Sequence, residues 1–152
     1  MQLLGEYDCK IDAKGRMRMP TGLMNQLGAS EEEQLTVVIN RGFEKCLMIY
    51  PENVWEKITT EINQLNLYNK KNRDFVRYFY RGANKVSVDN AERVLVSKRL
   101  LEYAGIEKDV ILSAYHDRIE MWAKDHYDLM LDNEPDDFSD LAEDVLGKIN
   151  LD

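Results

Sequence analysis

Cysteine and histidine are scarce in this chain of 152 residues, which holds two of each. Cys9 and Cys46 lack the CxxC spacing of zinc ligands, so we expect both to be reduced packing residues on strands. His116 and His126 stand in sequence contexts that fit neither a metal site nor a catalytic triad. The sequence therefore predicts neither a metal site nor a bound cofactor.

Long apolar runs are missing as well. No run approaches the roughly 18 residues of a membrane-spanning helix, and the start, MQLLGEYDCK, lacks the basic residues and the apolar stretch of a signal peptide. We therefore expect a cytoplasmic protein without a membrane partner. The sequence also lacks a glycine-rich phosphate loop, a nucleophile elbow and a paired histidine–carboxylate constellation. These absences favour a protein that is not an enzyme and has no small-molecule substrate.

Positive charge is in deficit over the whole chain, whose net charge is −8, but it is unevenly distributed. Lys and Arg number 7 against 10 Asp and Glu in residues 1–68, 9 against 3 in residues 69–99, and 4 against 15 in residues 100–152. The acidity is therefore concentrated at the C-terminal end, and the middle of the chain is basic. For this reason the low overall pI does not exclude a nucleic-acid partner.

Hydrophobic residues make up 44% of the chain, which is enough for a packed core in one domain or in two very small domains that share a core. Alternation, β-branched runs and helix caps predict an α+β chain. The expected strands are 3–11, 16–19, 35–40, 46–50, 85–89, 93–97, 109–114 and 117–122. The expected helices are 21–28, 51–65, 70–81, 98–105, 123–131 and 135–149.

The second half of the chain repeats the order of the first. Asp12 and Arg16 align with Asp89 and Arg93 at an offset of 77 residues, and beyond a polar turn the offset becomes 72. Element order, motif and helix caps agree between the halves, which indicates an internal duplication. We therefore expect two pseudo-symmetric units.

The repeated motif is Asp-x-x-x-Arg, and it allows two interpretations. Gly15 supplies a positive-φ position, so Asp12 can accept N–H groups across a β-turn and hold Arg16 in place, which is a structural role alone. Alternatively, Arg16 is presented with Lys14 and Arg18 to DNA phosphates or guanine edges. So few basic residues bind DNA tightly only when several copies act together, and this favours an oligomer.

Two further helices have uncertain roles. The segment 70–81 is aromatic on one side and basic on the other, and either stacks on bases or packs its aromatic side inward. The acidic segment 135–149 places Phe138, Leu141, Val145 and Ile149 at helical spacing.

Four stretches carry a family resemblance: GEYDCKIDAKGRMRMP, CLMIYPENVWEKI, RVLVSKRLLEYAG and RIEMWAKDHYDLM. They resemble the MraZ family of bacterial transcriptional regulators, within the SpoVT-AbrB superfamily, over roughly residues 4 to 131. The resemblance implies two tandem AbrB-like swapped-hairpin β-barrel units with short helices, in a compact, pseudo-symmetric chain. We place the units at residues 5–53 and 82–127, the connecting helices at 54–81, and an acidic C-terminal tail at 128–152.

The resemblance also implies a function. Members of the family assemble into closed rings and bind repeated double-stranded DNA sequences upstream of the division and cell-wall genes, mostly as repressors, which predicts a nucleoid-associated protein. The arginine of the motif is linked to DNA contact, which carries over to Arg16 and Arg93, and Lys14 and Gly15 also fit the first motif. The chain departs from the family pattern at Glu92, where glycine is common, and we expect this carboxylate to repel phosphate beside Arg93. An antitoxin-like or scaffold protein-interaction module of the same fold is the alternative.

Overall fold

The computed structural model describes residues 2–30, 32–134 and 137–148, and it is a mixed α+β structure. The strands are β1 (Leu3–Lys10), β2 (Arg16–Arg18), β3 (Thr36–Arg41), β4 (Leu47–Pro51), β5 (Asn84–Ser87), β6 (Arg93–Leu95), β7 (Asp109–His116) and β8 (Arg118–Ala123). The helices are α1 (Thr21–Gln26), α2 (Glu52–Ile62), α3 (Lys70–Tyr80), α4 (Lys98–Ala104), α5 (Lys124–Asp132) and α6 (Phe138–Leu146). The predicted α+β class is confirmed. Ile149, the fourth apolar residue expected in the last helix, lies outside the described residues.

The strands of the two halves are interleaved. Six of them form an antiparallel sheet in the order β1-β7-β8-β4-β3-β5, and β2 pairs with β6 in a separate ribbon. Exchanging each strand of the first half with its counterpart in the second reproduces this order read backwards. The sheet therefore has a pseudo-two-fold axis between β4 and β8, and a second self-paired ladder in the ribbon.

The predicted pair of swapped-hairpin barrels is confirmed only in part. The sheet is open, with β1 and β5 at its edges, and it does not close into a barrel. The offset of 72 residues holds for β4 and β8, where Leu47 pairs with Met121 and Ile49 with Ile119. In β3 and β7 the core-facing residues correspond at 73 instead. The predicted boundaries of the two units remain a prediction.

Residue alternation divides the core into two clusters on opposite faces of the sheet. On β3, Val37 points into a large aliphatic cluster that includes Leu23 of α1 and Leu100 of α4. Its neighbour Val38 points into an aromatic-rich cluster around Trp55 of α2. The ribbon, α1 and α4 thus lie on one face, and α2, α3 and α5 cover the other.

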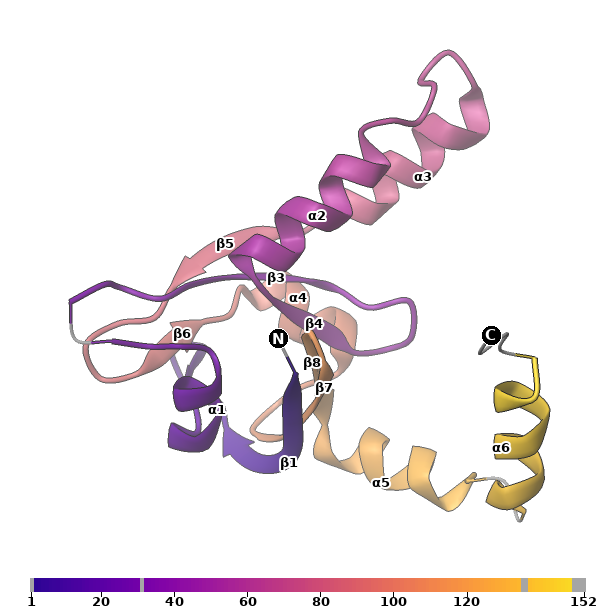
Figure 1. Cartoon of the computed structure of the whole chain (residues 1–152). Helices are drawn as coiled ribbons and strands as arrows, with labels where there is room; N and C mark the ends of the chain where they lie inside the picture. Colours follow the sequence, from indigo (N-terminus) through magenta and orange to yellow (C-terminus); the bar gives the residue numbers. More distant parts are fainter. Residues whose placement is uncertain (1, 31, 135–136, 149–152) are drawn as a thin grey trace.

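Two parts of the chain project from this body (Figure 1). Helices α2 and α3 run side by side as a hairpin, joined by a stack of Phe79 on Trp55 with ring centroids 5.6 Å apart. Helices α5 and α6 extend from the end of β8 in another direction. Within the described residues, no helix is both long and apolar enough to span a membrane.

Candidate nucleic-acid interface

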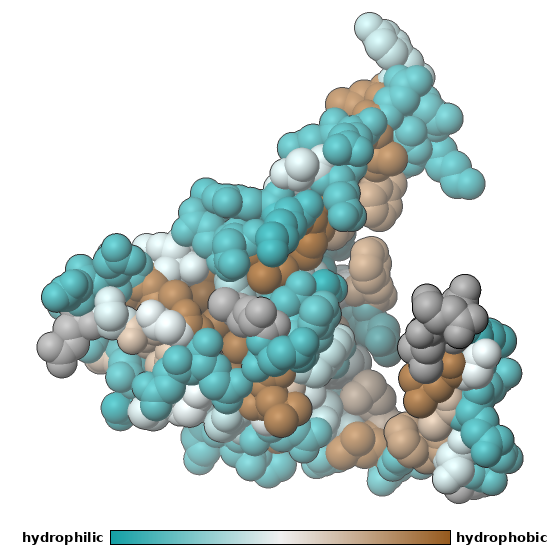
Figure 2. Space-filling model, viewed as in Figure 1, coloured by the Kyte–Doolittle hydropathy of each residue, from teal (hydrophilic) through white to brown (hydrophobic). Residues whose placement is uncertain are grey.

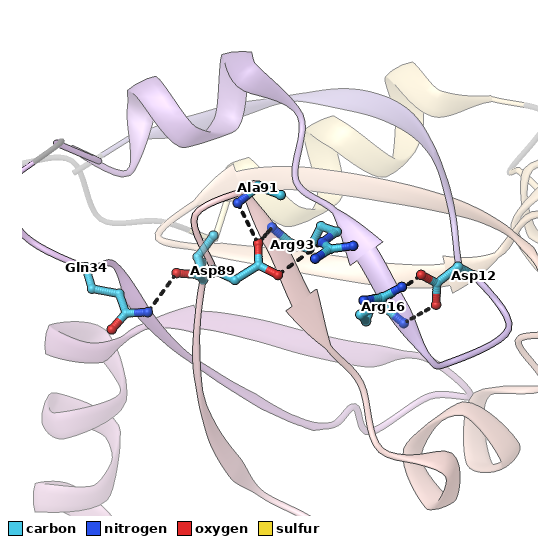
Figure 3. A network of polar contacts seen from close by, with 7 residues as sticks. Asp12, Arg16, Gln34, Asp89, Ala91 and Arg93 are labelled. Atoms are coloured by element: carbon cyan, nitrogen blue, oxygen red, sulfur yellow. Dashed lines mark hydrogen bonds and ion pairs between the residues drawn. The ribbon is translucent and has the colours of Figure 1, made fainter.

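The ribbon of β2 and β6 carries the basic residues predicted from the sequence. Met17 pairs with Val94 at its centre, and both side chains are fully buried. Because successive side chains on a strand point to opposite faces, the flanking residues face outward. These outward residues are Arg16 and Arg18 on β2, and Arg93 and Leu95 on β6. Figure 3 shows the two strands side by side.

The register of the ribbon brings the three arginines together. Arg18 lies directly opposite Arg93, and Arg16 lies opposite Leu95. Arg16 and Arg93 are thus diagonal neighbours, for which separations of about 7–8 Å are usual. Like charges at such distances repel each other, so this face is stabilised when an anion binds to it.

The first Asp-x-x-x-Arg motif forms a closed turn. Asp12 Oδ1 accepts the backbone N–H groups of Lys14 and Arg16, both at 2.9 Å, and Asp12 Oδ2 accepts Nε–H of Arg16 at 2.9 Å. The Gly15 N–H donates to the carbonyl of Asp12 at 3.0 Å. One carboxylate therefore organises the turn and fixes one edge of the guanidinium group.

The second motif repeats this geometry at the other end of the ribbon. Asp89 Oδ1 accepts the N–H groups of Ala91 at 2.9 Å and of Arg93 at 2.8 Å, and Oδ2 accepts Nε–H of Arg93 at 3.0 Å. The Glu92 N–H donates to the Asp89 carbonyl at 2.9 Å. The turn is anchored further by Gln34, whose side-chain amide donates to the carbonyl of Val88 at 3.2 Å. Sequence reasoning did not find this contact, because the two residues are distant in the chain.

Both arginines keep their outer nitrogens available. The carboxylates engage only Nε, and no hydrogen bond in the described part of the chain uses an Nη group of Arg16 or Arg93. Their side chains are 32% and 36% exposed, respectively. The Nη groups are the donors that form paired hydrogen bonds with guanine or phosphate. Each arginine is therefore held in place while its binding end is accessible.

The hydrogen bonds in the turns also hold both aspartates in the ionised form. The pKa of Asp12 lies below its usual value, first because of the backbone N–H of Arg16. The pKa of Asp89 is lowered in the same way, first by the backbone N–H of Arg93. Donors that stabilise the charged carboxylate make protonation less favourable. Both ion pairs therefore persist at neutral pH.

The two turns differ at their positive-φ position. Gly15 has φ +83° and Glu92 has φ +62°, so a glutamate occupies a left-handed conformation that suits glycine. One carboxylate oxygen of Glu92, Oε2, is buried without a hydrogen-bond partner among the described residues. Part of the carboxylate thus points into the protein, which weakens the expected repulsion of phosphate beside Arg93.

The first turn is also the more basic. At the offset of 77 residues, Ala91 corresponds to Lys14, and Leu95 corresponds to Arg18. Arg93 is therefore the one basic side chain that the second strand adds to the outward face of the ribbon. The sequence contains this asymmetry, which appears when the offset is applied to every basic residue of the first motif.

The cysteines and histidines form no site in the part of the chain that the structure describes, where no group of three or more His, Cys, Asp or Glu side chains could hold a metal ion. Cys46 is buried and Cys9 is half-buried. Burial is the largest cause that raises the pKa of Cys9 to about 11 and that of Cys46 to about 12. Both thiols are thus protonated at neutral pH.

Comparison with known proteins supports the resemblance seen in the sequence. Residues 2–78 and 79–148 each match the family described as "MraZ protein, putative antitoxin-like". The chain belongs to the MraZ family. The two matched MraZ stretches meet inside α3, so the hairpin of α2 and α3 connects the repeats.

Full-length relatives carry the same MraZ name. A protein of Christiangramia forsetii named "Transcriptional regulator MraZ" is 42% identical over 153 residues, covering 100% of this chain and 97% of the relative. Its namesake in Flavobacterium psychrophilum is 41% identical and covers 99% of this chain and 95% of the relative. In Cytophaga hutchinsonii the identity is 37%, with coverage of 94% and 93%.

Proposed function

We propose that this chain is a transcriptional regulator that binds double-stranded DNA through the outward face of the β2–β6 ribbon. The observation that carries the proposal is the ribbon itself, on which Arg16, Arg18 and Arg93 share one exposed face. Membership of a family whose relatives are named transcriptional regulators supports it. No enzymatic step is part of the proposed function.

The ribbon suits the major groove of DNA. A two-stranded β-ribbon fits that groove, and an arginine can donate two hydrogen bonds to a guanine edge. The Asp12 and Asp89 carboxylates orient the arginines in advance, so less side-chain freedom is lost on binding. In this mechanism Arg16 and Arg93 read bases, while Lys14 and Arg18 contact phosphates.

One ribbon offers few charges, so the proposal includes assembly. We expect several chains to form a closed ring that presents successive ribbons to successive operator repeats, because linked sites bind far more tightly than one. The target is an operator upstream of division and cell-wall genes, the effect is repression, and the protein is located at the nucleoid.

Arg16→Ala tests the proposal, with Lys57→Ala on the exposed side of α2 as the matched control. A lost base contact costs about 1–3 kcal/mol, which is roughly a tenfold loss or more for each ribbon engaged. An electrophoretic shift assay with the protein's own upstream DNA should show near-complete loss for Arg16→Ala, a smaller loss for Arg93→Ala, and none for the control. If Arg16→Ala bound like the wild type with its oligomer intact, the role of Arg16 would be refuted. If the wild type did not bind that DNA, the antitoxin-like or scaffold alternative would be favoured.

A further inference from the structure

Helix α6 carries an apolar stripe that nothing in the described part of the chain covers. The helix contains no buried residue. With 3.6 residues per turn, four apolar side chains fall on one face of it, and the acidic residues fall on the other and along its borders. The apolar residues are Phe138, Leu141, Val145 and Leu146, with exposures of 63%, 42%, 54% and 60%. Apolar surface of this kind usually marks an interaction site.

We call α5 and α6, residues 124–134 and 137–148, the arm. These ranges hold eight acidic residues and two lysines. Leu129 and Leu131 of α5 are also exposed, which extends the apolar surface. Figure 2 shows hydrophobic surface along the arm, bordered by hydrophilic residues. The arm therefore needs a partner that is apolar at its centre and basic around it.

The hairpin of α2 and α3 has the complementary properties. Its residues 67–85 hold six Lys or Arg against a single Asp. Phe79 and Tyr80 pack on Trp55, as expected if the aromatic side faces inward. Phe75 and Tyr78, however, remain exposed on α3, and so does Tyr68 in the loop before it. The inward packing predicted for this helix is thus only partial, and an aromatic strip with basic neighbours is left open.

Charge decides the occupant of both surfaces. An acidic apolar helix and a basic aromatic helix attract each other and can pack their apolar faces together, with rim charges that set orientation. Figure 1 places α6 apart from the hairpin of its own chain. We propose that the arm of one chain packs on the α2–α3 hairpin of a second copy of this chain. This inference rests on the ring in the proposed function but not on its DNA contacts.

The contact joins two different surfaces, and this fixes its consequence. Each chain offers one arm and one hairpin, so every added copy leaves one arm and one hairpin free. A head-to-tail contact of this kind propagates until a ring closes. The arm and the hairpin thereby provide the assembly that brings several ribbons onto one DNA.

Four variants with exposed substitutions test the contact by sedimentation velocity. The arm variant carries Leu141→Asp and Val145→Asp, and its matched control is Ser139→Asp on the opposite side of α6. The hairpin variant is Tyr78→Asp on α3, and its matched control is Thr60→Asp on the outer side of α2. We expect the arm and hairpin variants to sediment as monomers of 17.8 kDa, with unchanged circular dichroism, and the controls to sediment as the wild type does.

Mixing the two monomeric variants is the decisive step. The hairpin variant retains its arm and the arm variant retains its hairpin, so the mixture should form a species of two chains that neither variant forms alone. An arm variant that keeps the wild-type size, or a mixture that stays monomeric, would overturn the proposal. Docking of the arm on its own hairpin would also leave the mixture monomeric. If the wild type itself were monomeric at all concentrations, the ring of the proposed function would fail as well, whereas unchanged variants of an assembled wild type refute this inference alone.

Discussion

Glu92→Gly should stabilise the protein, because it replaces a strained residue in one of two equivalent turns. A non-glycine residue in the left-handed region costs about 1–2 kcal/mol, and Glu92 has φ +62°. Glycine loses about 0.4–1 kcal/mol of this gain through its freedom in the unfolded chain. Removing the buried, unpartnered Oε2 atom adds to the gain. The net expectation is a free energy of unfolding higher by about 1 kcal/mol, or a melting temperature higher by about 2–4 °C in a chain of this size.

The first turn supplies the reverse experiment. Gly15→Ala should destabilise the protein by about 1–3 kcal/mol, since an added Cβ would lie 2.9 Å from the carbonyl oxygen of Val96 while φ is +83°. Glu92→Ala keeps the positive φ and removes the carboxylate, so the difference between Ala and Gly at position 92 isolates the backbone strain. Differential scanning calorimetry at one protein concentration measures all three variants. If Glu92→Gly melted at or below the wild-type temperature, or no higher than Glu92→Ala, the strain argument would be refuted.

Further predictions concern pH, the hairpin and the thiols. Since the pKa values of Asp12 and Asp89 are lowered in the fold, their stabilisation is complete above the unfolded value of about 4 and is lost as pH falls through the folded values. Urea midpoints from pH 7 to 3 should therefore fall less steeply when both are changed to Asn, and an equal slope would contradict this. Trp55→Ala should lower the free energy of unfolding by about 3–5 kcal/mol, because Trp55 packs on α3; a urea titration showing a loss below 1 kcal/mol would contradict this. Cys9 and Cys46 should react slowly with a thiol reagent at pH 8 and quickly after denaturation; fast labelling of the native protein would oppose the assigned burial.

Local features of the fold could be predicted from the sequence because their causes are local. The turn at Asp12 depends on hydrogen bonds within four residues, and the glycine at its positive-φ position is visible in the sequence. Pro51 and Ser97 mark the starts of helices, and Ser97 Oγ accepts the N–H of Leu100 at 3.4 Å. The repeat itself follows from counting residues.

The partners of the strands could not be predicted, because pairing depends on the packing of the whole chain. Nothing near β1 indicates that Leu3 pairs with His116, and the motif alone does not reveal that Arg18 faces Arg93. The burial of Glu92 Oε2 likewise depends on how the turn packs against the rest of the protein. The candidate site was therefore predictable as two separate turns, whereas their union on one ribbon required the structure.

The interleaved sheet has a consequence for synthesis of the chain. Strand β1 must find β7, which follows roughly a hundred residues later, and β4 must find β8. At translation rates of about 5–20 residues per second, β1 waits roughly 5–20 s before its partner has been made. During that interval the first half exposes the edges of β1, β2 and β4, and pairings so distant in sequence form slowly. First halves emerging from neighbouring ribosomes can pair with each other through these same edges, so folding of the correct chain is a race between the second half and a misassembled twin.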